Sequence, residues 1–112
     1  MHKPIQGDII LTDFDPVIGH EQSGYRPALV VSNSVFNNAS NLVLICPITN
    51  TNRKKPMDIP LTHTKTTGYI LCEHIRAVDL LSRGCKVTGD VVTKETLLRV
   101  ADILQGAVDV LI

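Results

Sequence analysis

Apolar residues occur in short blocks along about the first ninety positions, separated by glycine, proline and polar residues. Blocks of roughly four to eight residues, bounded by turn residues, are typical of β-strands. The blocks Pro27–Asn33 and Leu42–Thr49 are continuous rather than alternating, which predicts strands buried on both faces. Pro60 inside a shorter block predicts an edge strand, because proline donates no ladder hydrogen bond. The predicted strands are 8–14, 27–33, 42–49, 57–61, 69–78 and 85–92.

The end of the chain has a different period. Apolar residues recur there at three- and four-residue steps, which places them on one face of an α-helix. Thr93 is positioned to cap the N-terminus of this helix, and Val92 and Leu97 have the spacing of a hydrophobic staple. The face consists of Leu97, Val100, Ala101, Leu104, Val108 and Leu111. Leu98, Ile103 and Val110 lie off this stripe and leave a second apolar surface for a partner.

Many short strands followed by one helix indicate a mainly β fold, a small bent sheet or partial barrel closed by the C-terminal helix. The chain has 112 residues, so we expect a single domain over 1–112. A domain of this size buries roughly two-thirds of the surface that its unfolded chain exposes. It therefore needs neither a metal nor a disulfide to fold.

The composition narrows the possible functions. Aromatic residues make up 4% of the chain and Trp is absent, which argues against a nucleic-acid platform of stacked aromatic rings. The 11 Lys and Arg balance the 11 Asp and Glu, so bulk charge does not hold nucleic acid. A local basic groove remains possible, and a neutral chain has no strong charge barrier to self-association.

Cys46, Cys72 and Cys85 are widely spaced and form no C-x-x-C pair, so we expect no zinc site and no cofactor. We interpret Cys46 and Cys72, inside apolar runs, as buried small hydrophobes in a reducing compartment. The chain has neither an apolar signal core nor a run of 18 apolar residues. We therefore expect a cytoplasmic protein without a membrane partner.

Two connections are candidates for function. The segment 15–26 is too long for a tight hairpin and too polar for the core, which is typical of a binding loop. The segment 50–56 carries the basic run Arg53-Lys54-Lys55, which we expect to border a polyanion.

Polar residues border the predicted strands at several points. Arg26 directly precedes Pro27, which holds its backbone extended, and Thr49 ends the following strand. An arginine fork, a hydroxyl and a carboxylate suit phosphoryl chemistry without a metal, because the fork matches phosphate oxygens and stays charged. Taken singly, each residue is more often a surface ion pair or a turn residue. The remaining candidates are Glu21, Glu73 and Arg76, with His20 and His74 as possible proton carriers.

Three separated motifs resemble one family. The first runs from Gly7 to Ser32 and contains His20-Glu21-Gln22-Ser23-Gly24-Tyr25-Arg26-Pro27. The second is Cys46-Pro47-Ile48-Thr49, and the third is Leu71–Asp79 followed by Arg83-Gly84. Together they look like the signature of the MazF/PemK/Kid toxins, and the resemblance covers essentially the whole chain.

The resemblance implies an SH3-like partial barrel, the fold of MazF, PemK and CcdB-like toxins. It also implies a homodimer and a cognate antitoxin that blocks the RNA groove. The implied activity is that of an mRNA interferase, a sequence-specific, metal-independent endoribonuclease that cuts single-stranded RNA and so inhibits translation and growth. No DNA partner is expected for the toxin alone. The family's catalytic residues map onto Arg26, Thr49 and Glu21.

The expected RNA contacts surround these catalytic positions. His74 departs from the glutamine that often occupies its place in the family. The expected contacts are His20, Gln22, Asn33, Asn50, Arg53, Lys54, Lys55, Glu73, His74 and Arg76.

In the mechanism that this set suggests, a general base accepts the proton of an RNA 2′-hydroxyl while Arg26 and Thr49 stabilise the phosphorane charge. Whether Glu21, Glu73 or His74 is that base stays open. The alternative function is a non-catalytic toxin of the same fold that inhibits a protein such as DNA gyrase through the apolar end 108–112. A third is an SH3-like binding module, although such grooves need clustered aromatics.

Overall fold

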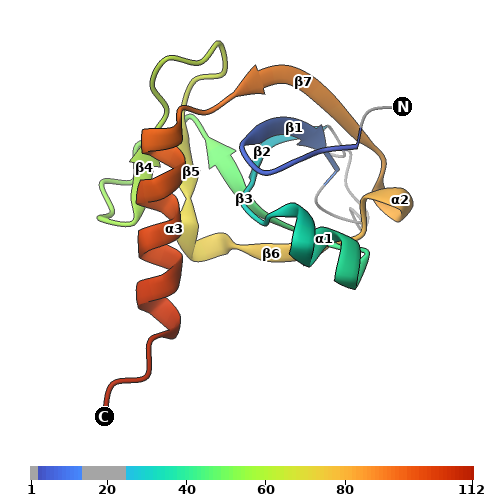
Figure 1. Ribbon diagram of the computed structural model, residues 1–112. Coiled ribbons are helices and arrows are strands. Elements are labelled where there is room, and N and C mark those ends of the chain that lie inside the picture. Colours follow the sequence, from blue (N-terminus) through green and yellow to red (C-terminus); the bar gives the residue numbers. More distant parts are fainter. Residues whose placement is uncertain (1–2, 14–24) are drawn as a thin grey trace, which may run out of the picture.

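Figure 1 shows the computed structural model, which describes residues 3–13 and 25–112. The described strands form one antiparallel sheet in the order β4-β5-β3-β2-β1-β7, and β6 pairs with the other part of β3. The expected mainly β fold with a C-terminal helix is thus confirmed. The elements are β1 Asp8–Thr12, β2 Arg26–Val30, α1 Ser34–Ser40, β3 Val43–Thr49, β4 Asp58–Pro60, β5 Tyr69–Leu71, the 3₁₀ helix η1 Cys72–His74, β6 Arg76–Val78, α2 Leu80–Arg83, β7 Cys85–Val91 and α3 Lys94–Val108.

The predicted strand 69–78 is wrong as a single element. It divides into β5, η1 and β6, and both strands pair with the same edge of β3. Ile45 and Ile48 are three positions apart on β3, whereas their partners Arg76 and Ile70 are six positions apart. The surplus residues leave the ladder as η1, closed by the Ile75 amide donating to the Cys72 carbonyl at 3.3 Å. This turn carries Glu73 and His74 out of the sheet.

The helix α1 was not predicted, because the segment that forms it has no helical apolar period. It depends instead on side-chain hydrogen bonds. The Asn33 side chain caps its N-terminus by accepting from the Phe36 amide at 3.0 Å. Inside, the buried Asn37 bonds to the hydroxyl and the carbonyl of Ser32. The single-turn helix α2 was also not predicted.

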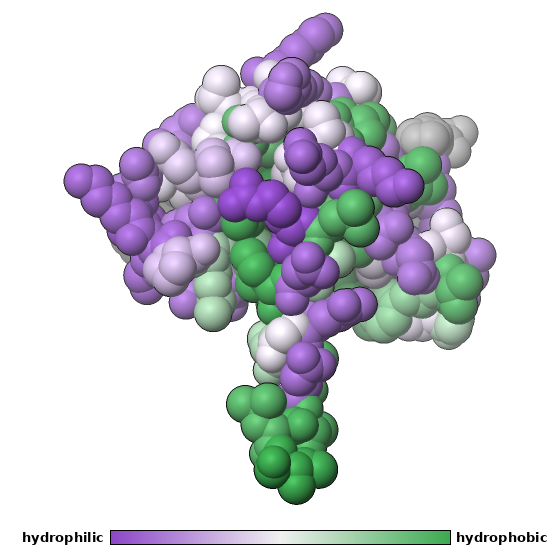
Figure 2. Space-filling model, turned by 60° about the vertical axis from the view of Figure 1, so that its left-hand side comes forward, coloured by the Kyte–Doolittle hydropathy of each residue, from purple (hydrophilic) through white to green (hydrophobic). Residues whose placement is uncertain are grey.

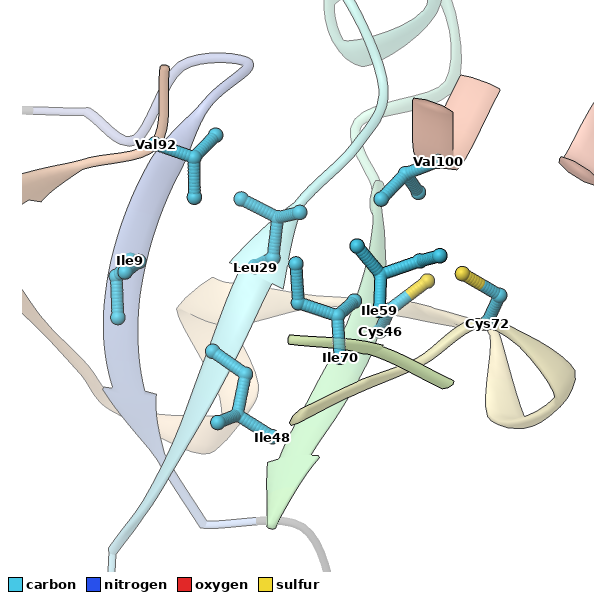
Figure 3. Packing of buried hydrophobic residues seen from close by; sticks show 9 residues of the cluster. All are labelled: Ile9, Leu29, Cys46, Ile48, Ile59, Ile70, Cys72, Val92 and Val100. Atoms are coloured by element: carbon cyan, nitrogen blue, oxygen red, sulfur yellow. The ribbon is translucent and has the colours of Figure 1, made fainter. Parts of the chain in front are cut away.

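The central strands are buried on both faces, as their continuous apolar runs predicted. On β1, β2 and β3, neighbouring residues belong alternately to two apolar clusters. Figure 3 shows the first cluster, which lies between the sheet and α3 and consists of Ile9, Leu29, Cys46, Ile48, Ile59, Ile70, Cys72, Val92 and Val100. The second consists of Ile10, Ala28, Val30, Val43, Ile45 and Val78. The strand β4, with Pro60, forms an edge of the sheet as expected.

The helix α3 closes the first cluster. Thr93 caps it by accepting from the Thr96 amide at 3.1 Å, and Val92 and Leu97 pack into the same cluster, which confirms the predicted cap and staple. The assignment of Ile103 to a free face was wrong, because Ile103 packs against the core beside Leu104.

The last residues of the chain leave the body of the molecule. Figure 2 shows this apolar end projecting from the body, below the rest of α3. Its four apolar side chains contact little of the protein and are 77% to 114% exposed. They belong to Val108, Val110, Leu111 and Ile112.

The three cysteines are free thiols. Cys46 and Cys72 are buried, as interpreted from the sequence, and their sulfur atoms face each other in Figure 3. Hydrogen bonding to Cys72 and burial raise the pKa of the Cys46 thiol. Cys85 is half-buried, and its burial raises its pKa. Among the described residues, no helix has the length and apolar character to cross a membrane.

Candidate active site

One row of residues crosses the sheet where β1 ends, β2 begins and β3 ends. Thr12 on β1 pairs with Arg26 on β2. Continuing the β2–β3 register from Ala28 and Pro47 by two residues sets Arg26 opposite Thr49. Side chains directly opposite each other on antiparallel strands share a face and lie close together. The structure thus brings the predicted Arg26 and Thr49 to the same end of neighbouring strands.

Arg26 is exposed and its backbone is fixed by the pairing with Thr12 and by the following Pro27. Within residues 3–13 and 25–112 its guanidinium makes no hydrogen bond or ion pair. An arginine held only through its backbone keeps all five N–H donors for a ligand, and that ligand is best an anion with paired oxygens.

Thr49 is half-buried, and its hydroxyl oxygen accepts from the Thr51 amide at 3.2 Å. The hydroxyl proton has no acceptor among the residues that the structure describes, so it is available to a ligand. Gly68 lies directly behind: its φ is +128°, and a Cβ there would sit 2.5 Å from the Thr49 carbonyl oxygen. The sequence analysis did not assign Gly68 a role. Asn50 lies beside them and accepts from the Thr67 hydroxyl at 2.9 Å.

The other end of the row is closed by β7. Thr12 is buried, pairs with Cys85 and donates its hydroxyl to the Gly84 carbonyl at 3.0 Å. The Lys86 ammonium lies 5.4 Å from the centre of the Tyr25 ring, a cation–π distance. Lys86 was not predicted, since only the β1–β7 pairing brings it to this end of the sheet.

The predicted residues Glu21, His20 and Gln22 lie outside the described residues. In the sequence they stand between Asp13 and Tyr25, the described residues on either side. Arg83 binds the first of these two, with its Nη1 donating to the Asp13 carbonyl at 3.0 Å.

A second group of predicted residues gathers around Arg53, which follows β3. Its Nε and Nη2 donate to the two carboxylate oxygens of Asp58 at 2.8 and 2.7 Å. Nη2 also lies 3.3 Å from Oε1 of Glu73, and Nη1 lies 3.5 Å from Nε2 of His74. Lys55 adds a second cation 3.8 Å from the same Glu73 oxygen. We call these five residues the Arg53 cluster.

Asp58, which the sequence analysis missed, anchors this cluster by binding Arg53. Its side chain is 3% exposed, and the hydrogen bonds from Arg53 hold its pKa below the usual range. The same hydrogen bonds raise the pKa of Arg53. Sequence offered no signal for Asp58, because a carboxylate at the start of a short edge strand is ordinary there. The cluster carries two cations and two carboxylates, so its charges largely compensate.

The remaining predicted contacts lie apart from both groups. The Asn33 side chain caps α1, beyond the opposite end of β2 from Arg26. Arg76 pairs with Ile45, four residues along β3 from Thr49, which is roughly 13 Å at about 3.3 Å per residue. Lys54 is exposed, and its amide donates to Asn52 at 3.0 Å. Their contacts with RNA stay predictions. Among residues 3–13 and 25–112, no three His, Cys, Asp or Glu side chains gather as metal ligands do.

Comparison with known proteins identifies the family. The MazF endoribonuclease toxin of Escherichia coli (strain K12) is 34% identical over 102 residues, which cover 91% of this chain and 92% of that protein. The crystal structure of MazF from Deinococcus radiodurans has a TM-score of 0.81 at 30% identity and covers 96% of this chain and 97% of that one. A mycobacterial endoribonuclease in complex with its cognate antitoxin has a TM-score of 0.73 at 25% identity, with 94% of each chain covered.

The resemblance seen in the three sequence motifs extends over almost the whole chain. The family described as the PemK-like, MazF-like toxin of type II toxin–antitoxin systems matches residues 5–108. This range includes the row of Thr12, Arg26 and Thr49 and the whole Arg53 cluster. The chain belongs to the PemK-like, MazF-like family of toxins of type II toxin–antitoxin systems.

Proposed function

We propose that this toxin cuts single-stranded RNA at short sequences in the cytoplasm, without a metal ion, and that it acts as a homodimer. The chain is an endoribonuclease toxin, as its named relatives are. These relatives favour this function over the gyrase-inhibitor alternative. The mechanism, the partners and the catalytic residues of this chain are proposed below.

The row of Thr12, Arg26 and Thr49 carries the proposal. Among the described residues, neither its arginine fork nor the neighbouring threonine proton has a partner, and both groups are on strand ends that the sheet holds in place. Such preorganised donors stabilise charge that develops in a transition state, and they need no rearrangement as it forms. When a phosphodiester is attacked, negative charge develops on its phosphate oxygens, and Arg26 and Thr49 are placed to stabilise it.

The reaction is an internal displacement at phosphorus. A general base takes the proton of the 2′-hydroxyl, the 2′-oxygen bonds to the adjacent phosphorus, and the bond to the 5′-oxygen breaks. The departing oxygen takes a proton and becomes a 5′-hydroxyl, while the phosphate remains as a 2′,3′-cyclic diester. Arg26 and the Thr49 hydroxyl bind the equatorial oxygens of the phosphorane. DNA is spared because it lacks the nucleophile.

Three residues are candidates for the base, Glu21, Glu73 and His74. Glu21 is five residues from Arg26 along the chain, which an extended segment spans in at most roughly 18 Å. Glu73 and His74 belong to the Arg53 cluster on η1. In either arrangement Lys54 and Lys55 border the path of the RNA, since they follow Thr49 by only five and six residues.

The partner of the toxin is a cognate antitoxin, in keeping with the mycobacterial relative solved with its own. An acidic segment of such a partner would compete with RNA for Arg26 and the lysines. The homodimer rests on the apolar surface of α3 and of the chain end, where Leu98 is 55% exposed. Light scattering at micromolar concentration is expected to give the mass of a dimer, and a monomer mass would remove this part of the proposal.

The test of the activity is incubation of the purified protein with a long RNA in the presence of EDTA, followed by mapping of the ends. We expect cuts at a small set of short sequences, leaving 2′,3′-cyclic phosphate and 5′-hydroxyl ends. Cleavage that stops in EDTA and returns with zinc or magnesium would contradict the metal-free mechanism. Intact RNA combined with inhibition of gyrase supercoiling would support the alternative function.

A further inference from the structure

The basic run Arg53-Lys54-Lys55 does not act as a unit, because its first member is already bound within the protein. Arg53 binds Asp58 through two parallel hydrogen bonds of 2.8 and 2.7 Å. Of the two side chains, Asp58 is 3% exposed and Arg53 22%. A fork-to-fork pair of this kind fixes the plane of the guanidinium as well as its position. An RNA phosphate would have to compete with a buried carboxylate for it.

The edge of the guanidinium that Asp58 leaves free points to η1. Nη2 reaches Oε1 of Glu73 at 3.3 Å and Nη1 reaches Nε2 of His74 at 3.5 Å. A guanidinium has donors only, so this contact requires the lone pair of His74 Nε2. The ring proton of neutral His74 is then on Nδ1. Arg53 thereby sets the position of one side chain and the tautomer of the other.

We propose that Arg53 and Asp58 are positioning residues that hold Glu73 and His74 for the bases or the 2′-hydroxyl of RNA. The inference rests on the proposed function. Asp58 begins β4 and pairs with Leu71, the residue just before η1. The pairing of β4 with β5 therefore places the Asp58 carboxylate beside the turn that carries Glu73 and His74. Glu73 and His74 are both exposed and keep polar atoms for a ligand. A carboxylate accepts from base amino groups and an Nδ1–H donates to base acceptors, which suits unstacked bases.

A positioning role and a purely structural role predict different activities for a double variant that regains stability. Arg53→Gln leaves the Asp58 carboxylate without its cation, and Asp58→Asn leaves the fork without its anchor. The double variant Arg53→Gln/Asp58→Asn removes both charges and is expected to regain thermal stability, because no buried charge is left uncompensated. Its cleavage activity is expected to stay low, since Glu73 and His74 still lack their support.

Cleavage kinetics and ¹⁵N NMR of the His74 ring test this. We expect Arg53→Lys, which keeps the charge but loses the fork, to lower kcat/KM roughly 10- to 100-fold, the usual cost of misplacing reacting groups by about 1 Å. In Arg53→Gln and Asp58→Asn, the His74 nitrogens are expected to shift from the single Nδ1–H tautomer to a mixture. The matched control is Lys94→Gln, an exposed lysine on α3, which is expected to leave the His74 spectrum and kcat unchanged.

The outcomes separate this inference from the proposed function. A parent protein that cuts no RNA overturns the proposed function. A parent that cuts, with Arg53→Lys cutting equally well and the His74 tautomer unmoved, overturns the positioning role alone. Activity that returns together with stability in the double variant overturns it as well, because the pair would then serve only to hold the fold.

Discussion

Arg26, the first residue of β2, and Arg53, in the loop after β3, are held in opposite ways. Arg26 is fixed through its backbone, by β-pairing and a following proline, and its side chain makes no hydrogen bond or ion pair with the described residues. Arg53 lies in a loop, and its side chain is fixed by Asp58, Glu73 and His74. An arginine whose main chain is rigid can offer its whole fork to a ligand. An arginine whose fork is already bound within the protein orders its neighbours instead, so the two arginines of the candidate site take different roles.

The largest expected effect comes from removing the free fork. Arg26→Ala is expected to lower the cleavage rate about 100- to 1000-fold, since one preorganised donor to a developing oxyanion is worth roughly 3–4 kcal/mol. The melting temperature is expected to stay the same, because the side chain is exposed and makes no hydrogen bond or ion pair with the described part of the chain. Thr49→Ala is expected to resemble it. The controls are Arg99→Ala and Thr62→Ala at exposed positions. Full activity in either site variant would contradict the role of the row.

The second largest effect is expected at Gly68, which lies directly behind Thr49. Gly68→Ala is expected to destabilise the fold by roughly 1–3 kcal/mol and to lower cleavage, because the φ of +128° and the 2.5 Å approach to the Thr49 carbonyl leave no room for a methyl group. The matched control is Gly106→Ala in α3, where a Cβ meets nothing within 4 Å. That variant is expected to stabilise the protein by up to about 1 kcal/mol. Thermal melts and cleavage rates measure both, and a stable, active Gly68→Ala would show that β3 tolerates displacement.

The bound arginine predicts an acid-dependent contribution to stability. Arg53 lowers the pKa of Asp58 from its ordinary value of 3.8, so the stabilisation is fully present above that value and is lost as the pH falls below it. The difference in unfolding free energy between the parent and Asp58→Asn is therefore expected to be constant near neutral pH and to shrink in acid. Urea unfolding from pH 7 to pH 2.5 measures it, and a pH-independent difference would contradict the ionic character of the pair.

The smallest effect concerns the salt dependence of RNA binding. Lys54→Gln/Lys55→Gln is expected to reduce the slope of log K against log salt by about 1.4, since each phosphate contact on a single strand contributes roughly 0.7. Adding Arg53→Gln is expected to change the slope little further. If the triple variant lowers the slope by the equivalent of a third phosphate contact, Arg53 leaves Asp58 for a phosphate when RNA binds.

Elements that depend on residues close together in the chain were predicted correctly from the sequence. The cap at Thr93, the staple of Val92 and Leu97 and the edge strand marked by Pro60 depend on residues close together in the chain. The break at η1 could not be predicted, because it arises from a mismatch in length with β3, a partner distant in sequence. Ile103 was misplaced because an apolar stripe does not reveal how wide a surface the neighbouring sheet covers.

The candidate site divides in the same way. Residue type and order determined that Arg26, a proline and Thr49 occur at strand ends, and this was enough to indicate phosphoryl chemistry and the toxin family. Only the tertiary structure decided that Arg53 is bound by Asp58, whereas Arg26 makes no hydrogen bond or ion pair within residues 3–13 and 25–112. Whether a long side chain finds a carboxylate depends on the β4–β5 pairing that brings Asp58 beside η1, and such contacts between strands are not written in the spacing of either segment.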